Sequence, residues 1–315
     1  MQSMSEPSFT ATAAAHQRSG ILFAVGAYGL WGFLPAYFLI LAPAGPIEIV
    51  ACRILFSLVF CVLLITVNHK WQVLVAVVKQ RRVLFNLGLA AALIFINWQV
   101  YVYATLAGQV NEAALGYFIN PIVTVLLGVI LLREKLRIAQ WTAVGISAIA
   151  VLVLAVNYGV FPWISLALAF SFGLYGLIKK RVGPRVDAVT GLTIETAWLV
   201  PVAIAQLIFV GATSGIVLGN AGIANTILLV LSGVITAIPL ILFAAAARRL
   251  PLVYMGLIQY LTPVLQLLFG TFVMHEAMPP ERWIGFGLVW VALVILSIDM
   301  VAHGRAARRA LPLPG

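Results

Sequence analysis

Apolar residues gather in ten long runs along the chain, separated by short segments with proline, glycine or charged residues. Each run has roughly 20 residues, which in a helix is enough to cross the hydrocarbon core of a bilayer. The pattern therefore predicts an all-α integral membrane protein with ten transmembrane helices. The predicted spans are residues 20–41, 46–67, 83–107, 112–132, 138–156, 161–178, 188–210, 223–247, 251–274 and 283–302.

Composition supports a membrane protein. Of the 315 residues, 63% are hydrophobic and 9% are charged, and the mean hydropathy is +1.10. Soluble domains carry about 25% charged residues, so this chain has too little polar surface for water. The net charge of +10 does not indicate nucleic-acid binding, because membrane proteins collect basic residues in their cytoplasmic loops.

The positions of the basic residues test the division into spans. If the ten spans are threaded in order, 17 of the 19 Lys and Arg residues fall on the side of the N-terminus. Arg282 falls on the opposite side and Arg53 falls inside a span. This asymmetry predicts that both termini are cytoplasmic. Residues 71–78 are predicted either to lie on the cytoplasmic leaflet as an interfacial helix or to extend the second span.

The second half of the chain repeats the first at an offset of 142 residues. The matched positions are Pro121, Gly128, Glu134, Trp141 and Gly145, which recur as Pro263, Gly270, Glu276, Trp283 and Gly287. Each half then holds five spans, and because five is odd, the halves have opposite orientations in the membrane. Inverted repeats are typical of secondary transporters that work by alternating access. A duplicated channel or a non-transporting scaffold remains the alternative.

The repeat suggests four segments. We expect residues 1–19 to be a disordered cytoplasmic tail and residues 20–156 to be the first repeat. Residues 157–302 would be the second repeat, and residues 303–315 a basic cytoplasmic tail.

Two charged residues inside spans are the strongest candidates for a substrate pathway. Arg53 lies about 10 Å into the second span, and Glu195 lies at the matched position in the seventh. Charges inside a membrane are costly and usually face a cavity or a partner. We expect Arg53 to attract an anionic or polar group of the substrate, and Glu195 to bind a cationic group or a proton. The alternative is a structural pair, for Arg53 with Glu48 or Glu112.

Uncharged residues at mid-membrane depth extend this pathway. Asn97, Asn120, Gln259 and Thr262 are polar, and Trp31 could stack on a substrate or simply pack in the core. Pro121 and Pro263 lie inside spans, and each frees a backbone carbonyl. They are predicted either to act as a kinked gating pair beside the substrate or to bend helices that are stabilised by packing.

Motifs spread over most of the chain resemble those of a known family. They are Ala27-Tyr28, Leu30-Trp31-Gly32, Pro35-Ala36-Tyr37-Phe38, Arg53, Asn97-Trp98 and Leu115-Gly116-Tyr117-Phe118-Ile119-Asn120-Pro121 in the first half, and Ile194-Glu195-Thr196, Trp198, Pro201, Gln259-Tyr260, Pro263 and Trp290-Val291-Ala292-Leu293 in the second. Together they resemble the RarD branch of the EamA family, in the drug/metabolite transporter superfamily. The resemblance implies ten helices in two EamA repeats in a bacterial inner membrane. It supplies no set of binding residues.

The sequence lacks the short motifs of common enzymes, including H-E-x-x-H, G-x-S-x-G, C-x-x-C and the phosphate-binding loop. We therefore expect no enzyme activity, no cofactor and no metal, and energy from an ion or solute gradient. The expected function is secondary transport of small organic solutes, either proton-coupled or by exchange. The expected partners are a small-molecule substrate and the lipid bilayer, not nucleic acid, with a homodimer left open.

Overall fold

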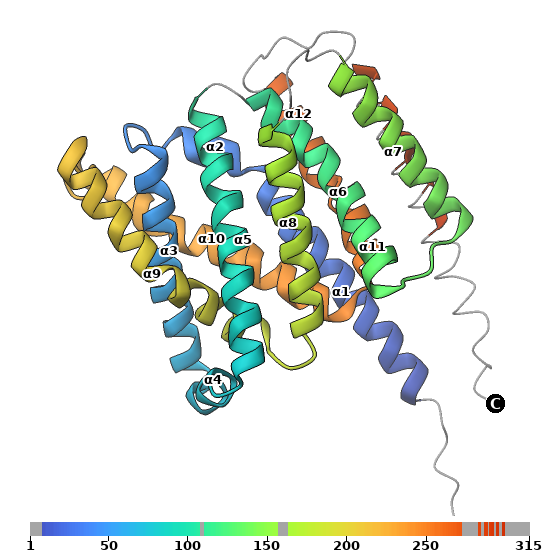
Figure 1. Ribbon diagram of the computed structural model, residues 1–315, viewed down its shortest axis with the longest axis horizontal. Helices are drawn as coiled ribbons and strands as arrows, with labels where there is room; N and C mark the ends of the chain where they lie inside the picture. The colour runs from blue at the N-terminus through green and yellow to red at the C-terminus, as the bar shows by residue number, and fades with distance from the viewer. Residues whose placement is uncertain are drawn as a thin grey trace, which may run out of the picture.

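The computed structural model describes residues 8–107, 110–156 and 163–272, and parts of the last predicted span at 283–284, 287–288, 290–292, 294–295 and 298–299. These residues form helices joined by short connections, with no strand among them (Figure 1). The helices are α1 (Ser8–Gly32), α2 (Leu34–Leu39), α3 (Pro46–Val67), α4 (Trp71–Val78), α5 (Arg81–Leu106), α6 (Val110–Leu132), α7 (Ile138–Val156), α8 (Trp163–Val182), α9 (Ala188–Thr213), α10 (Ile223–Arg249), α11 (Leu252–Ile258) and α12 (Leu261–Phe272).

Five helical stretches in the described part of the chain are long and apolar enough to cross a membrane. They are His16–Leu39, Pro46–Val67, Arg81–Leu106, Ala188–Thr213 and Ile223–Arg249. Two shorter apolar helices are Gly116–Leu132 and Ile138–Ala150. The described part of the protein is therefore all-α, with helices suited to a bilayer, as the hydrophobic pattern predicts. Helices α3 and α7 have the predicted bounds, and α1 begins well before the predicted start at residue 20.

Two of the predicted spans are broken helices, which the apolar runs did not indicate. The first run divides at Phe33 into α1 and α2 because Pro35, at the start of α2, has no N–H for the carbonyl of Trp31. Gln266 Nε2 donates to that carbonyl instead, at 3.3 Å. The ninth run divides into α11 and α12 just before Pro263, and the carbonyl of Gln259 accepts from the nearer N–H of Thr262 at 3.1 Å.

Residues 71–78 form the separate helix α4, so the predicted extension of the second span is wrong. Helix α3 ends at Val67, and His69 turns the chain with a φ of 53°. A positive φ is incompatible with a continuing right-handed helix. Figure 1 shows α4 at one end of the bundle, where it lies across the ends of neighbouring helices.

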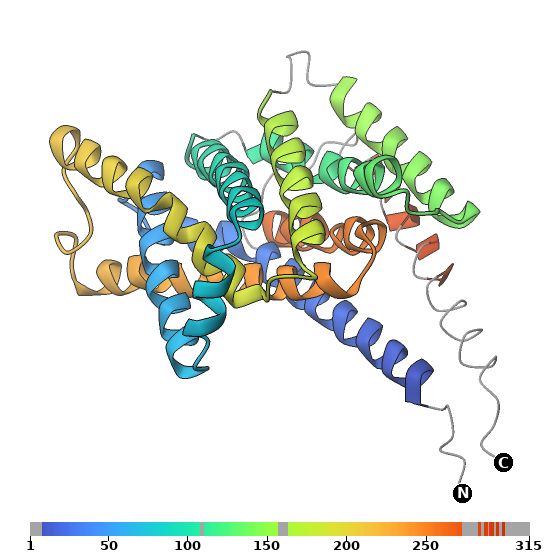
Figure 2. The ribbon, with the colours of Figure 1, turned by 60° about the horizontal axis from the view of Figure 1, so that its bottom comes forward.

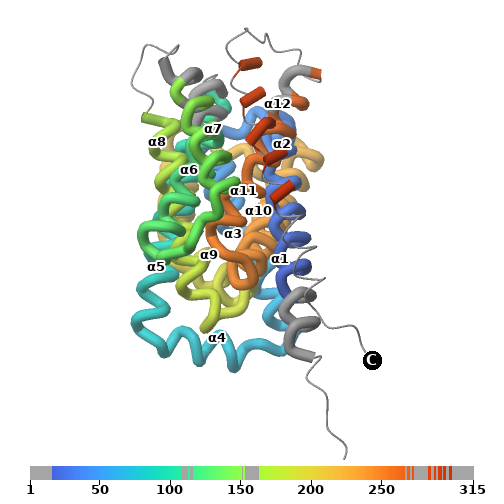
Figure 3. The backbone as a smooth tube through the Cα atoms, turned by 90° about the vertical axis from the view of Figure 1, so that its right-hand side faces the viewer, coloured from blue at the N-terminus to red at the C-terminus, as the bar shows by residue number. Residues whose placement is uncertain are grey.

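That end of the bundle carries most of the basic residues in the described segments, and we call it the basic end. It holds the α3–α4–α5 connections, the α8–α9 turn and the end of α10 (Figures 1 and 3). Lys70 Nζ lies 3.3 Å from Asp187 Oδ1 there. Asp187 also caps α9 by accepting from the N–H of Thr190. Burial alone would raise the pKa of Asp187, but the bonds from Thr190 and the Lys70 charge hold it below its usual value.

For most contacts between two helices, the equivalent helices of the other repeat are also in contact. The offset of 142 to 144 residues relates α1 to α8, α3 to α9, α5 to α10, and α6 to α11 and α12. Contact between α1 and α10 thus corresponds to contact between α8 and α5, and both occur (Figures 1 and 2). Likewise α3 against α10 corresponds to α9 against α5, and α6 against α8 corresponds to α12 against α1. Helices α3 and α9, which are each other's counterparts, pack together.

The crossing of α3 and α10 is unusually close. A Cβ atom added to Gly233 would lie 2.2 Å from the carbonyl carbon of Phe56, so only glycine fits. Ser57 Oγ donates to the carbonyl of Gly233 at 2.9 Å. One turn along, Arg53 Nε donates to Thr236 Oγ1 at 2.8 Å. The glycine contact therefore sets the distance at which Arg53 meets α10.

Gly233→Ala is expected to destabilise the protein by about 1–3 kcal/mol, because the added methyl group overlaps backbone that cannot move aside. Thermal unfolding of the purified protein in detergent would measure the loss. Gly145→Ala is the matched control, since a Cβ there meets no atom of the described residues within 4 Å. Equal melting temperatures for the two variants would contradict the close crossing.

Candidate functional site

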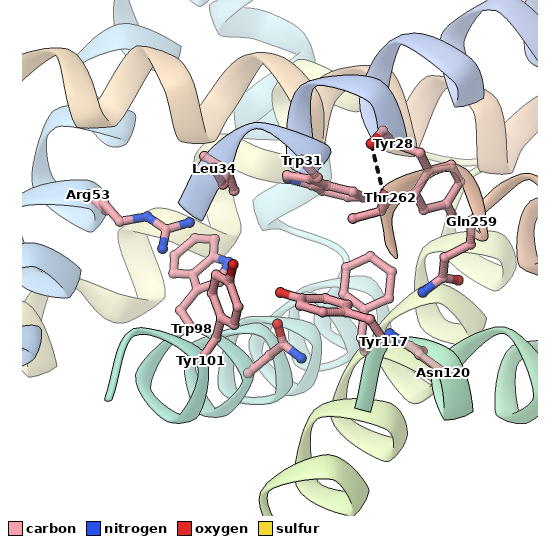
Figure 4. A pocket seen from close by; sticks show the side chains of 12 residues that line it. Tyr28, Trp31, Leu34, Arg53, Trp98, Tyr101, Tyr117, Asn120, Gln259 and Thr262 are labelled. Atoms are coloured by element: carbon pink, nitrogen blue, oxygen red, sulfur yellow. Dashed lines mark hydrogen bonds between the residues drawn. The ribbon is translucent and has the colours of Figure 1, made fainter. Parts of the chain in front are cut away.

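A pocket with about 470 Å³ of empty space, counting the open space at its mouth, lies in the helix bundle and is lined by both halves of the chain (Figure 4). Most of its lining comes from α1, α2, α3, α5 and α6 of the first half, and the rest from α8, α12 and the break before α12. The lining residues are Tyr28, Trp31, Leu34, Arg53, Asn97, Trp98, Tyr101, Tyr117, Asn120, Phe172, Gln259 and Thr262.

The structure brings most of the predicted pathway residues together in this pocket. They are Trp31, Arg53, Asn97, Asn120, Gln259 and Thr262, and Glu195 is the one that does not line it. The two predicted kink prolines also lie outside the lining. Pro263 sets the break before α12, whereas α6 runs unbroken through Pro121. The carbonyl of Pro121 packs against Gly256 of α11, where an added Cβ would lie 3.0 Å from it.

Arg53 is buried, with 2% of its surface exposed, and it reaches the pocket from α3. Its Nε donates to Thr236 Oγ1, and its Cζ lies 4.9 Å from the ring centres of both Phe38 and Trp98. No carboxylate of the described side chains forms an ion pair with it, and its Nη1 has no hydrogen-bond partner.

The expected alternative of a pair between Arg53 and Glu48 is wrong. Glu48 Oε1 accepts from the backbone N–H groups of Val217 and Leu218, at 2.9 and 2.8 Å. These two bonds satisfy the carboxylate away from the pocket. The other expected partner, Glu112, has a side chain outside the described part of the structure.

Hydrogen bonds between the halves hold the walls of the pocket. Asn97 Nδ2 on α5 donates to the carbonyl of Leu168 and to Ser171 Oγ on α8, both at 3.1 Å. Thr262 Oγ1 donates to the carbonyl of Tyr28 at 2.8 Å, shown as the dashed line in Figure 4. These side chains satisfy backbone carbonyls at positions where lipid could not.

Several buried polar atoms at the pocket have no partner within the described structure. They include Arg53 Nη1, Asn120 Nδ2, Gln259 Oε1 and the hydroxyl of Tyr28. More than nine in ten buried polar groups in proteins are hydrogen-bonded. A cluster of four exceptions around one cavity indicates a site that binds a polar ligand or water.

Aromatic rings separate the pocket from the basic end. Trp31 and Phe172 meet edge to face at 5.2 Å, and both pack against Phe243. Tyr175 stacks on Phe243 at 5.7 Å with an angle of 19° between the rings. Because Tyr175 follows Phe172 by almost one turn along α8, this stacked pair lies one layer closer to the basic end.

Glu195 lies beyond this aromatic layer, in a buried ion pair. Its Oε1 is 2.6 Å from Lys179 Nζ, and its Oε2 accepts from the hydroxyl of Tyr175 at 3.2 Å. Lys179 lies just past the predicted span at 161–178, but α8 continues to Val182 and 6% of the lysine side chain is exposed. The lysine is buried because of tertiary packing, since it forms an ion pair with Glu195 on α9.

Sequence reasoning did not single out several residues of the site. Tyr101 shares a helix face with Asn97 and Trp98 on α5, so spacing alone could have indicated it. Phe172 is equivalent to the pocket residue Tyr28 at the repeat offset of 144, so the repeat could have indicated it. Nothing in the sequence marks Thr236, because threonine is unremarkable in an apolar helix.

Comparisons with known proteins agree with the motifs. Residues 18–156 match the EamA-like transporter family. Protein RarD of Streptomyces exfoliatus is 45% identical, over 94% of this chain and 93% of that protein. The uncharacterized transporter YojE of Bacillus subtilis (strain 168) is 40% identical, over 93% and 98%, and Protein RarD of Escherichia coli (strain K12) is 38% identical, over 91% and 97%.

The chain belongs to the EamA family. Its resemblance to the RarD branch is confirmed, and membership of the drug/metabolite transporter superfamily follows. An EamA protein of this kind is a multi-pass membrane transporter. The fold is also shared with a solved crystal structure at a TM-score of 0.68, with 17% sequence identity, over 89% of this chain and 98% of the other.

The Lys179–Glu195 pair predicts a specific pattern of stabilities. Lys179→Met or Glu195→Gln alone leaves the partner buried and unpaired, and should cost about 3–5 kcal/mol. The double variant removes both charges and should recover most of that loss. Thermal unfolding in detergent tests this, with Lys70→Met, in a pair with 40% of the lysine side chain exposed, as a nearly neutral control. Additive losses in the double variant would contradict the pairing.

Proposed function

We propose that this EamA protein is a secondary transporter of small organic solutes across the bacterial inner membrane, working by alternating access. In this proposal the ten predicted spans form two inverted repeats, 20–156 and 157–302, and the basic end faces the cytoplasm. Proton coupling or solute exchange supplies the energy. Bacterial relatives named as transporters support the general function.

The observation that carries the proposal is an asymmetry between equivalent positions. Trp31, Leu34, Arg53 and Tyr101 line the pocket. Their counterparts in the second half are Tyr175, Ile178, Glu195 and Phe243, and none of these lines it. Tyr175 is stacked on Phe243, and Glu195 is paired with Lys179. At these four positions the first half lines a cavity where the second half is packed, whereas both members of three other equivalent pairs line the pocket: Tyr28 and Phe172, Tyr117 and Gln259, and Asn120 and Thr262.

This asymmetry is what alternating access requires. If the two halves exchange conformations, the stacked layer toward the basic end opens and the present pocket closes. A passive channel would need both sides open together, and the aromatic layer disfavours that. Glu195 is the carboxylate that proton coupling would use, because a proton bound there removes the charge that holds Lys179. No second function is favoured by an observation of comparable weight.

Paired cysteines at equivalent positions test the exchange. The background variant has both native cysteines removed by Cys52→Ala and Cys61→Ala. Leu34→Cys then places a thiol in the pocket lining, and Ile178→Cys places one at the equivalent position of the second half. A membrane-impermeant thiol reagent should reach the first from the outside and the second from the cytoplasmic side. A transported solute should change the two labelling rates in opposite directions. Labelling of both cysteines from the same side would contradict alternating access.

Transport itself should show counterflow. Proteoliposomes loaded with a solute should take up the labelled solute against its own gradient, because a carrier returns loaded more readily than empty. The double variant Lys179→Met/Glu195→Gln, which is expected to keep most of its stability, should abolish the response to an imposed pH gradient while leaving solute exchange measurable. Glu48→Gln is the matched control, since Glu48 is buried but bound to backbone N–H groups away from the pocket. Flux that never saturates and shows no counterflow would indicate a channel instead.

A further inference from the structure

The pocket has one charged residue among its described lining, and that residue is a cation. Arg53 is buried, and no carboxylate among the described side chains pairs with it. Burying a charge without a counterion costs several kcal/mol, and an arginine deep in a membrane protein normally faces an anion or water. The electrostatic field in the pocket therefore favours a ligand with a negative charge.

The guanidinium is held in one orientation, as a binding group should be. Thr236 fixes its Nε, and the rings of Phe38 and Trp98 contact the group, with their centres 4.9 Å from Cζ. Figure 4 shows the nitrogens turned toward the pocket, with Nη1 free of a partner. A planar guanidinium fixed in this way suits two parallel hydrogen bonds to a carboxylate.

The other end of the pocket is polar but uncharged. Figure 4 places Gln259 and Asn120 across the pocket from Arg53. The buried unpaired amide atoms there are one donor, Asn120 Nδ2, and one acceptor, Gln259 Oε1. Together they suit a neutral group that both accepts and donates, such as a hydroxyl. Between the two ends lie the rings of Trp31 and Tyr117, which offer flat apolar surface.

We propose that the pocket binds small monocarboxylates with a flat, apolar body and a neutral polar group at the far end, and that Arg53 holds the carboxylate. This substrate class rests on the transport function proposed above. A ligand with an ammonium group fits less well, because no carboxylate of the described residues lines the pocket. The neutral amide of such an acid keeps the shape but loses the charge.

Isothermal titration calorimetry on the full chain in lipid nanodiscs at pH 7 tests the class without requiring transport. The probes are 4-hydroxybenzoate, phenylacetate and indole-3-acetate, each compared with its primary amide, and 4-hydroxybenzylamine as the cation. The carboxylates should bind about 10- to 100-fold more tightly than their amides, which is the range expected for hydrogen bonds to a charged group. Equal affinity of acid and amide, or no binding of any acid at millimolar concentration, would overturn the proposal.

Variants assign the selectivity to Arg53. Arg53→Gln should remove the preference for acid over amide, whereas Arg249→Gln should keep it, because Arg249 packs on Phe23 instead of lining the pocket. Thr236→Val keeps the shape but frees Nε, and as a change in a positioning residue it should weaken acid binding while amide binding stays unchanged. If Arg53→Gln does not fold, Thr236→Val carries the test. Unchanged selectivity in Thr236→Val would then overturn the role of Arg53.

The far end has its own test. Gln259→Leu should weaken the binding of 4-hydroxybenzoate but not of benzoate, which lacks the hydroxyl. Equal effects on both acids would overturn the assignment of that end. Failure of the transport function would appear as cysteine labelling from one side only, with acid binding intact. Failure of the substrate class would appear as counterflow of neutral solutes without acid selectivity.

Discussion

The arrangement of the site depends on one buried guanidinium. Arg53 sits inside an apolar bundle, and neither lipid nor a protein carboxylate among the described side chains neutralises it. Its position follows from a backbone contact, because the crossing of α3 and α10 at Gly233 brings Thr236 within reach of Nε. Two rings then shield the faces of the guanidinium. The protein thus satisfies part of the arginine and leaves the remainder directed at a cavity.

Backbone groups at the broken helices follow a similar logic. A membrane helix interrupted by proline exposes carbonyls that lipid cannot satisfy. Here side chains just after the break in the second half supply donors to carbonyls near the break in the first half. Thr262 and Gln266 of α12 donate to the carbonyls of Tyr28 and Trp31 in α1. Polar side chains therefore gather where the two repeats meet, and this is why the pocket forms there.

Much of this was predictable from the sequence, because polar residues are rare in its apolar runs. Their rarity alone indicated Arg53, Asn97 and Asn120, which the structure places in one pocket. The repeat offset indicated Thr262 as the counterpart of Asn120. Apolar runs also marked most helices to within a few residues, since burial in lipid requires an uninterrupted apolar stretch.

The effect of each proline was not predictable, because it depends on partners elsewhere in the fold. Proline interrupts the helix near Pro35 and near Pro263, but α6 continues through Pro121. A break requires a donor for the freed carbonyl, and Gln266 supplies one to Trp31. Lys179 was missed for a related reason. A lysine near the end of an apolar run is normally solvated, and only the packing of α8 near α9 shows that it is buried against Glu195.

The opposite signs of Arg53 and Glu195 give the proposed cycle a chemical asymmetry. They occupy equivalent positions, yet Arg53 has no carboxylate partner among the described side chains and Glu195 is already paired. If the halves exchange conformations, the cavity that opens toward the basic end is lined by Glu195 with Lys179, which together carry no net charge. An anion held by Arg53 on one side would then meet a neutral or repulsive site on the other. Binding on one side and release on the other would follow from this difference without any covalent step, and a proton on Glu195 would set how strongly the two sides differ.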